Sequence, residues 1–276
     1  MHPVLFHVGA FPITSYGAAL TIAFSVGTAV AMHRARRADL DPERVLETAM
    51  VVLVSALLGA RLFHVFLNPE EFADQGWLRT ILPFAPDGAV RGVVGLSVMG
   101  GLPTALACSY AFLRLRGDPW WPTMDVMAPS VALGAGITRI GCFLNGCCHG
   151  RTCDWPWAVE YPADSLSALV LPAASIHPTQ LYQAIAGFVL FGLLVAYARR
   201  SPSSGRVLAG LCLGMGLQRF VVEFVRHHAP HEIALAAGGI ELTTYQVTAA
   251  GLVLFGCALW LRRGLEAAPV AIASRT

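Results

Sequence analysis

Residues 139–151 hold the densest group of side chains in this chain that could do chemistry. Arginines stand at both ends of the segment, and the Asn145 amide between them offers donors and an acceptor. Three glycines permit sharp turns and a close approach of the backbone to a ligand; they are Gly141, Gly146 and Gly150. A helix end with incidental polar residues is the alternative. Arg139 lies inside an apolar run, which favours a binding site.

Four cysteines cluster in and just after this segment: Cys142, Cys147, Cys148 and Cys153. The membrane topology derived below puts them in an oxidising compartment, so a structural disulfide is the leading prediction. Zinc is a second possibility, with His149 as a further donor. However, the C-x4-C-C-H-x3-C spacing does not match the usual zinc-binding pairs, and no metal is predicted. A nucleophilic or acceptor thiol stays open as a third interpretation.

Charged residues also fall inside the apolar runs, where a charge is costly and marks a functional candidate. These residues are Arg61, Asp125, Arg139, Arg219 and Glu223. An ion pair between helices, or a side chain reaching the headgroups, would explain each one alone. As a set they leave an excess of guanidinium groups, whose planar fork fits phosphate oxygens. An anionic lipid headgroup is therefore the predicted ligand.

Glu223 follows Arg219 by one helical turn, so the two side chains share a helix face. Such a pair partly neutralises itself in lipid, and it can also hold the guanidinium fork in position. Arg226 continues the same face toward the outer boundary of the membrane.

Composition indicates that these residues belong to a membrane protein. Of 276 residues, 55% are apolar and 13% are charged, whereas soluble domains carry about 25% charged residues. A membrane helix needs about 20 apolar residues, and backbone groups in lipid must be satisfied within the segment. Stretches of this kind occur at residues 13–32, 48–67, 90–113, 122–144, 179–198, 207–224 and 243–261. We predict an all-α, polytopic membrane protein with seven transmembrane helices in a single domain, residues 1–276.

Arginines alternate between the connecting segments and set the orientation. The segments after the first, third, fifth and seventh stretches hold most of them: Arg34, Arg36, Arg37, Arg44, Arg114, Arg116, Arg199, Arg200, Arg206, Arg262, Arg263 and Arg275. The opposite segments hold Arg79, Arg91, Arg151 and Arg226. The positive-inside rule then predicts an N-terminus outside and a C-terminus in the cytoplasm. The first stretch lacks a preceding basic region, so no signal peptide is expected.

The chain resembles the prolipoprotein diacylglyceryl transferase family over nearly its full length, through motifs in the family's order. The motifs are Tyr16-Gly17, Gly59-Ala60-Arg61, the Gly-rich stretch from Gly95 to Gly100-Gly101, Asp125, the segment from Arg139 to Arg151, His177-Pro178 with Gln180 and Tyr182, and Arg219-Phe220 with Glu223 and Arg226. Any one of them alone would be weak, but together they are specific.

The resemblance implies transfer of a diacylglyceryl group from phosphatidylglycerol to a cysteine thiol of a lipoprotein precursor. A thioether forms and glycerol phosphate leaves, with arginines stabilising the charge on the leaving group. Catalytic roles are expected for Arg139, Arg219, Glu223 and Asn145, with Glu223 and Asp125 positioning the arginines. Substrate-binding roles are expected for Tyr16, Arg61, Gly100, Gly101, Asp125, Gly150, Arg151, His177, Gln180, Tyr182 and Arg226.

The chain also departs from the family pattern. Met99 stands where the family usually has a histidine with a base role, and Met215 stands in place of a tyrosine. Cys142 and Cys147 replace an asparagine and a glutamate. This pattern is typical of a divergent branch in which other groups supply replacement chemistry. The candidates are His149, as a substitute base, with Cys142, Cys147 and Cys148.

The expected partners are phosphatidylglycerol, a lipoprotein precursor with a lipobox cysteine, and membrane lipids. No cofactor is expected. The net charge of +2 is too small to predict a nucleic-acid partner. The expected location is a bacterial cytoplasmic (inner) membrane. Two alternatives stay open: a same-fold paralogue acting on another acceptor or lipid, and a non-catalytic lipid-binding membrane protein.

Overall fold

A computed structural model describes residues 4–9, 11–72, 98–162, 165–172, 174–200, 203–228, 233–237 and 240–266. The chain separates into two compact units. Unit 1 comprises residues 1–34 and 124–276, and unit 2 comprises residues 35–123. The expectation of a single domain over residues 1–276 is not tested by this division and stays a prediction.

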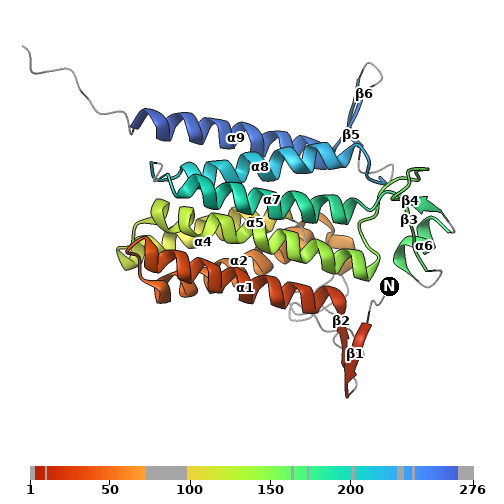
Figure 1. Ribbon diagram of the computed structural model, residues 1–276, viewed down its shortest axis with the longest axis horizontal. Helices are drawn as coiled ribbons and strands as arrows, with labels where there is room; N and C mark the ends of the chain where they lie inside the picture. Colours follow the sequence, from red (N-terminus) through yellow and green to blue (C-terminus); the bar gives the residue numbers. More distant parts are fainter. Residues whose placement is uncertain are drawn as a thin grey trace, which may run out of the picture. The chain divides into compact units, whose positions relative to one another are not determined.

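Long helices dominate the described residues (Figure 1). They are α1 (Ser15–Arg37), α2 (Pro42–Leu67), α4 (Val98–Arg116), α5 (Trp120–Asn145), α7 (Thr179–Ala198), α8 (Arg206–Glu223) and α9 (Thr244–Glu266). Each overlaps one of the seven predicted stretches, although residues 90–97 of the third stretch lie outside the described residues. Five of these helices, α1, α2, α5, α7 and α9, are long and apolar enough to cross a membrane.

The described residues also contain short elements that the all-α prediction missed. Three two-stranded antiparallel sheets occur, formed by β1 (Val4–Val8) with β2 (Phe11–Thr14), β3 (Val159–Glu160) with β4 (Ser175–Ile176), and β5 (Ile233–Ala237) with β6 (Ile240–Thr243). A 3-10 helix, η1 (Pro69–Phe72), and a short helix, α6 (Leu166–Val170), complete the elements. Because β2, β4 and β6 lead into α1, α7 and α9, the sheets mark one end of unit 1 (Figure 1).

Small residues let the helices of unit 1 approach closely. A Cβ at Gly187 of α7 would lie 3.0 Å from the Cα of Gly136 in α5. A Cβ at Gly216 of α8 would lie 2.8 Å from the carbonyl oxygen of Ala249 in α9. Small residues at helix interfaces are typical of membrane bundles, in which backbone proximity replaces the hydrophobic drive to associate.

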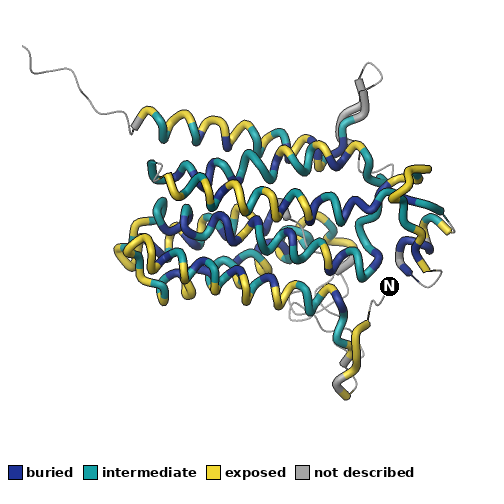
Figure 2. The backbone as a smooth tube through the Cα atoms, in the orientation of Figure 1, coloured by how far each residue is buried: buried dark blue, intermediate teal, exposed yellow. Residues whose placement is uncertain are grey.

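Large apolar side chains cover the outer faces of these helices. Exposed and half-buried residues run along the length of α9, and Leu254 and Phe255 on it are 70% and 52% exposed (Figure 2). On α7, Ile185 and Leu193 are each 62% exposed. Contiguous apolar surface of this kind is rare on soluble monomers. It fits helices that face lipid, in agreement with a multi-pass membrane protein.

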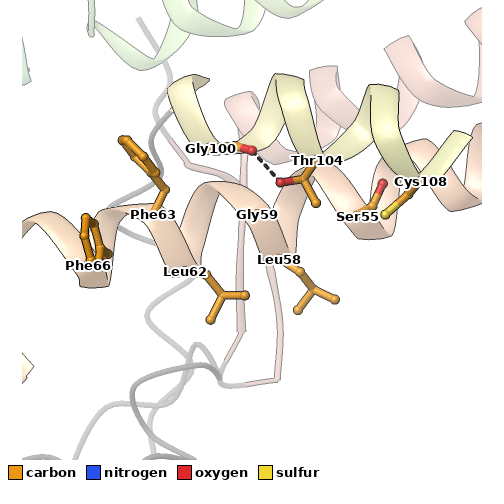
Figure 3. A pocket seen from close by; sticks show the side chains of 9 residues that line it. All are labelled: Ser55, Leu58, Gly59, Leu62, Phe63, Phe66, Gly100, Thr104 and Cys108. Carbon is orange, nitrogen blue, oxygen red and sulfur yellow. Dashed lines mark hydrogen bonds between the residues drawn. The ribbon is translucent and has the colours of Figure 1, made fainter. Parts of the chain in front are cut away.

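Unit 2 is built on the packing of α2 against α4. Gly59 and Gly100 sit at the closest approach, where a Cβ on Gly59 would lie 2.8 Å from the Gly100 carbonyl oxygen. A hollow of about 500 Å³ opens beside this contact (Figure 3). Its walls are Ser55, Leu58, Gly59, Leu62, Phe63, Phe66, Gly100, Thr104 and Cys108. The side chains lining the hollow are thus mostly apolar.

Asp125 near the start of α5 caps the N-terminus of α8. Its carboxylate oxygens accept hydrogen bonds from the backbone N–H groups of Gly205 and Leu208, at 2.5 and 2.8 Å. Gly205 precedes α8 with a φ of 94°, a conformation open to glycine. A carboxylate here satisfies free N–H groups and complements the helix dipole. In α5, Asp125 lies about 21 Å along the axis from Arg139, at about 1.5 Å per residue, so these two residues are not brought together.

We predict that Asp125→Ala lowers the free energy of unfolding by about 1 kcal/mol, since it removes the cap of α8. Thermal unfolding of the detergent-solubilised protein measures the effect. Asp154→Ala is the matched control, because Asp154 is an exposed aspartate. Equal melting temperatures for the two variants would contradict this role of Asp125.

Candidate active site

Most of the residues singled out from the sequence meet at one end of unit 1. The C-terminal ends of α5 and α8 and the N-terminal ends of α1, α7 and α9 lie there (Figure 1). The segment 146–153, which follows α5, runs across this end. Residues from α5, α7 and α8 therefore reach the same place although they are far apart in the sequence.

Backbone hydrogen bonds hold the segment between α7 and α8. The Gly150 N–H donates to the His177 carbonyl at 3.1 Å, and the His177 N–H donates to the Arg151 carbonyl at 3.0 Å. On the other side, the Arg151 N–H donates to the Val225 carbonyl at 2.9 Å. A Cβ at Gly150 would lie 2.7 Å from the His177 oxygen and 2.8 Å from the Val225 oxygen. Only glycine fits this position without moving the backbone.

Two buried side chains of α7 fix the adjacent turn. Gln180 Nε2 donates to the Cys147 carbonyl at 2.7 Å, and Thr179 Oγ1 donates to the Cys148 carbonyl at 2.9 Å. Thr179 is 1% exposed and Gln180 is 0% exposed. The predicted site residue Gln180 thus shapes the loop through its amide. The Arg151 side chain contributes a further link, because its Nε donates to the Arg226 carbonyl at 3.0 Å.

Glu223 is the buried anion of the site. Its side chain is 0% exposed, and its Oε2 lies 3.1 Å from Arg219 Nη2, which confirms the predicted helical pair. Thr243 Oγ1 donates to Glu223 Oε1 at 3.3 Å, and His228 Nδ1 lies 3.4 Å from the same oxygen. A buried carboxylate needs such partners, because an uncompensated charge is costly away from water. These contacts hold Arg219 in one orientation.

Tyr245 connects two arginines and was not found from the sequence. The Arg219 guanidinium carbon lies 4.6 Å from the centre of the Tyr245 ring, and that of Arg226 lies 5.7 Å from it. Both distances are within the range of cation–π attraction. The predicted topology could have indicated this residue. Tyr245 lies near the start of the last apolar stretch, which is on the same side of the membrane as the end of the preceding stretch that carries Arg219.

Arg139 on α5 adds a third positive charge. The charges of Arg139 and Arg226 both act on the Arg219 guanidinium, so the three groups are close enough to interact. Arg139 Nη1 also lies 4.0 Å from the Cys142 sulfur. The guanidinium groups of Arg139, Arg219 and Arg226 thus lie near the carboxylate of Glu223. The arrangement can therefore bind an anion with more than one negative charge.

Asn145 and Tyr16 lie beside the same group. The Asn145 side chain is within hydrogen-bonding reach of the Cys147 thiol. Tyr16 on α1 packs against α5, where a Cβ on Gly141 would lie 3.3 Å from the Tyr16 Cα. The charge of Arg139 acts on the Tyr16 hydroxyl, so the two side chains are close.

The cysteines do not form the expected disulfide. All seven cysteines lie in the described residues, and all are free thiols. The sulfur atoms of Cys142, Cys147 and Cys148 nevertheless lie within 4.8 Å of one another. Hydrogen bonds from the other two thiols, together with the charges of Arg226 and Arg139, lower the pKa of the Cys148 thiol below its ordinary value. A positive environment favours the thiolate form.

His149 is held in one tautomer by Ser167. Ser167 Oγ donates to the Gly146 carbonyl at 2.5 Å, so its one hydrogen is already used. The His149 Nδ1, 3.1 Å from the same oxygen, must then donate to it. Burial, followed by the nearby charge of His227, lowers the pKa of His149 and favours the neutral ring. Nε2 is buried and has no hydrogen-bond partner among the residues that the structure describes. Its role as a substitute base stays a prediction.

Aromatic residues border the site on the α7 side. Trp157 Nε1 donates to the Tyr182 hydroxyl at 2.7 Å, and His177 Nδ1 lies 3.2 Å from that hydroxyl. Trp155 and Trp157 are 55% and 50% exposed, as expected for side chains at a membrane interface. Burial raises the pKa of Tyr161 to about 12, so its hydroxyl stays protonated at neutral pH.

Three predicted residues belong to unit 2 instead. Arg61 is half-buried on α2. Gly100 and Gly101 on α4 are buried against α2, where a Cβ on Gly101 would lie 2.9 Å from the Ala56 carbonyl oxygen. These glycines have a packing role within unit 2. Their binding roles, like those of the residues gathered in unit 1, stay predictions. The side chain of Met99 lies outside the described residues.

Comparison with known proteins places this geometry in a family. The family model described as prolipoprotein diacylglyceryl transferase matches residues 3–262. The phosphatidylglycerol–prolipoprotein diacylglyceryl transferase of Bordetella avium is 31% identical over 261 residues, which cover 92% of this chain and 93% of the relative. The protein of the same name from Clostridium tetani is 29% identical over 226 residues, which cover 82% of this chain and 86% of the relative. The chain belongs to the prolipoprotein diacylglyceryl transferase family.

Proposed function

We propose that this chain transfers a diacylglyceryl group from phosphatidylglycerol to the cysteine thiol of a lipoprotein precursor. The observation that carries the proposal is the group of three arginines, Arg139, Arg219 and Arg226, with the buried carboxylate of Glu223 beside Arg219. The names of the relatives from Bordetella avium and Clostridium tetani supply the substrates. A cationic site at the end of a membrane protein fits a phospholipid headgroup.

In the proposed reaction the arginines bind the phosphate of phosphatidylglycerol. The acceptor sulfur attacks the glyceryl carbon, the carbon–oxygen bond to the phosphate breaks, and a carbon–sulfur bond forms. Glycerol phosphate leaves with the electron pair of the broken bond, and the thiol proton is lost. Negative charge builds up on the leaving phosphate. Prearranged guanidinium groups stabilise that charge more than they stabilise the bound substrate.

The remaining site residues support the bound headgroup. Asn145 offers an amide beside the arginines, and the aromatic border of Trp157, Tyr182 and His177 suits the interface where a lipid headgroup lies. Glu223 acts as a positioning residue, since it holds Arg219.

We also propose a seven-span topology with the N-terminus outside and the C-terminus in the cytoplasm of a bacterial inner membrane. The seven long helices and the alternation of arginines between connecting segments support it. The active-site end of unit 1 would then face outward, where lipoprotein precursors with a lipobox cysteine emerge. The Arg200 end of α7 would face the cytoplasm.

The transferase proposal predicts a mass gain on a substrate peptide. Purified protein is mixed with phosphatidylglycerol and a lipobox peptide, and a diacylglyceryl group should appear on the peptide cysteine. Arg139→Ala should reduce the rate about 100- to 1,000-fold, as loss of one charge-stabilising donor does. Mass spectrometry of the peptide measures both.

Arg200→Ala is the matched control, because Arg200 is an exposed arginine after the far end of α7. Its rate should equal that of the wild type. No transfer by the wild type, with phosphatidylglycerol still bound, would overturn the proposal. That outcome would favour another acceptor or a lipid-binding protein.

Tyr245 provides a finer test of the arginine group. Tyr245→Leu removes the ring on which Arg219 and Arg226 lie, while Tyr245→Phe keeps the ring and removes only the hydroxyl. A cation–π contact contributes about 0.5–2 kcal/mol, so the leucine variant should raise KM for phosphatidylglycerol about 2- to 30-fold. The phenylalanine variant should stay near the wild type. Steady-state kinetics at varied lipid fraction measure KM, and equal values for the two variants would exclude this role of the ring.

A further inference from the structure

Three thiols at the end of α5 converge on one point. The Sγ atoms of Cys142, Cys147 and Cys148 all lie within 4.8 Å of one another. Sulfur atoms that share one ion at about 2.3 Å, the usual zinc–thiolate distance, lie about 4 Å apart. The three sulfurs would therefore move by less than about 1 Å to bind a common ion.

The end of α5 creates this convergence. Gly146 adopts a φ of 75°, in the left-handed region that reverses the chain. The Gly146 N–H donates to the Phe143 carbonyl at 3.2 Å, and the Cys147 N–H donates to the Cys142 carbonyl at 3.1 Å. These bonds fold Cys147 back over the last turn of the helix. A thiol five positions after Cys142 thereby reaches it.

Cys148 completes the group from a constrained backbone. Its φ is 62°, which non-glycine residues rarely adopt unless their surroundings impose it. The bonds from Gln180 to the Cys147 carbonyl and from Thr179 to the Cys148 carbonyl impose it here. Both of these anchors use backbone carbonyls, so neither occupies a sulfur atom. The constrained backbone of Cys148 thus places its thiol beside those of Cys142 and Cys147.

A positively charged side chain lies next to the sulfur group. Arg139 Nη1 lies 4.0 Å from the Cys142 sulfur. Metals bind the thiolate and not the thiol. A metal ion with three thiolates carries a net negative charge for Cu(I) or Zn(II), which the neighbouring guanidinium groups would balance.

We propose that Cys142, Cys147 and Cys148 form a binding site for one thiophilic metal ion, Cu(I) or Zn(II). Thiolates select these two ions among the common biological metals. Binding replaces three S–H protons, which are released, with three metal–sulfur bonds, and no oxidation state changes. The site goes beyond the proposed transfer reaction and does not rest on it. The prediction of no metal was based on the spacing of the cysteines in the sequence. The turn at Gly146, which the spacing does not reveal, brings the three sulfurs together.

Metal titration of the full-length protein in detergent micelles tests the proposal. Metal-free, reduced protein is titrated with Zn(II) and, in a separate arm, with Cu(I), each against a coloured chelator. One ion per chain should bind in at least one arm. Cys142→Ser, Cys147→Ser and Cys148→Ser should each weaken binding at least about 100-fold. The ion that binds with the higher affinity is the one that the site prefers.

Cys153→Ser and Cys212→Ser are the matched controls, since these thiols lie outside the group. They should bind metal as the wild type does. Because a serine variant could fail to fold, thiol labelling of the wild type gives a second readout. Bound metal should protect three cysteines from a maleimide and leave Cys153 reactive to the same extent with and without metal.

Either of two results would overturn the proposal. One is binding of less than one ion per chain in both arms by reduced wild-type protein. The other is unchanged binding by a folded Cys142→Ser variant. The lipid-transfer rate is measured separately on the same preparations. A failure of metal binding is therefore distinguishable from a failure of the transferase proposal.

Discussion

The narrow space around Gly150 is the constraint on which the site depends. Its backbone lies between the carbonyl groups of His177 and Val225, with no room for a side chain. Through this contact the residues after α5 pair with those before α7 and those after α8. The contact joins segments that are separated by tens of residues. Without it, the arginines of α5 and α8 would have no common loop to lie beside.

Charge balance is the second constraint, and it follows from the first. Once α5 and α8 end beside one another, Arg139, Arg219 and Arg226 repel. Glu223 compensates for part of this repulsion, and the face of Tyr245 offers the arginines weak further attraction. The remaining positive charge favours an anionic ligand. Stability of the ligand-free protein favours neutralising the three arginines, whereas binding of a phosphate favours leaving them positively charged. The buried carboxylate of Glu223 neutralises part of the charge and leaves the rest.

The sequence predicted the helices well because apolar runs in lipid have few alternatives to a helix. It also predicted the Arg219–Glu223 pair, since helical spacing alone places residues four apart on one face. The short sheets were missed because residues such as 159–160 and 175–176 pair over a long separation and carry no periodic signal. Tyr245 was missed because its arginine partners, Arg219 and Arg226, precede the last apolar stretch and are not linked to it by helical spacing. Asp125 was expected beside arginines, but capping of α8 is a long-range contact that local pattern cannot reveal.

Two of the four departures from the family pattern, Cys142 and Cys147, lie where the thiols converge. The resemblance implies polar groups at these two positions; here both carry sulfur, and the Cys142 sulfur lies 4.0 Å from Arg139 Nη1. A neutral thiol leaves the full charge of Arg139 available to a phosphate, whereas a thiolate competes for it. The protonation state of the thiols therefore affects the electrostatic potential that a bound headgroup would experience. Arg139 lies beside Cys142 and interacts with Arg219, so the protonation of the Cys142 thiol would affect the proposed phosphate site through this one side chain.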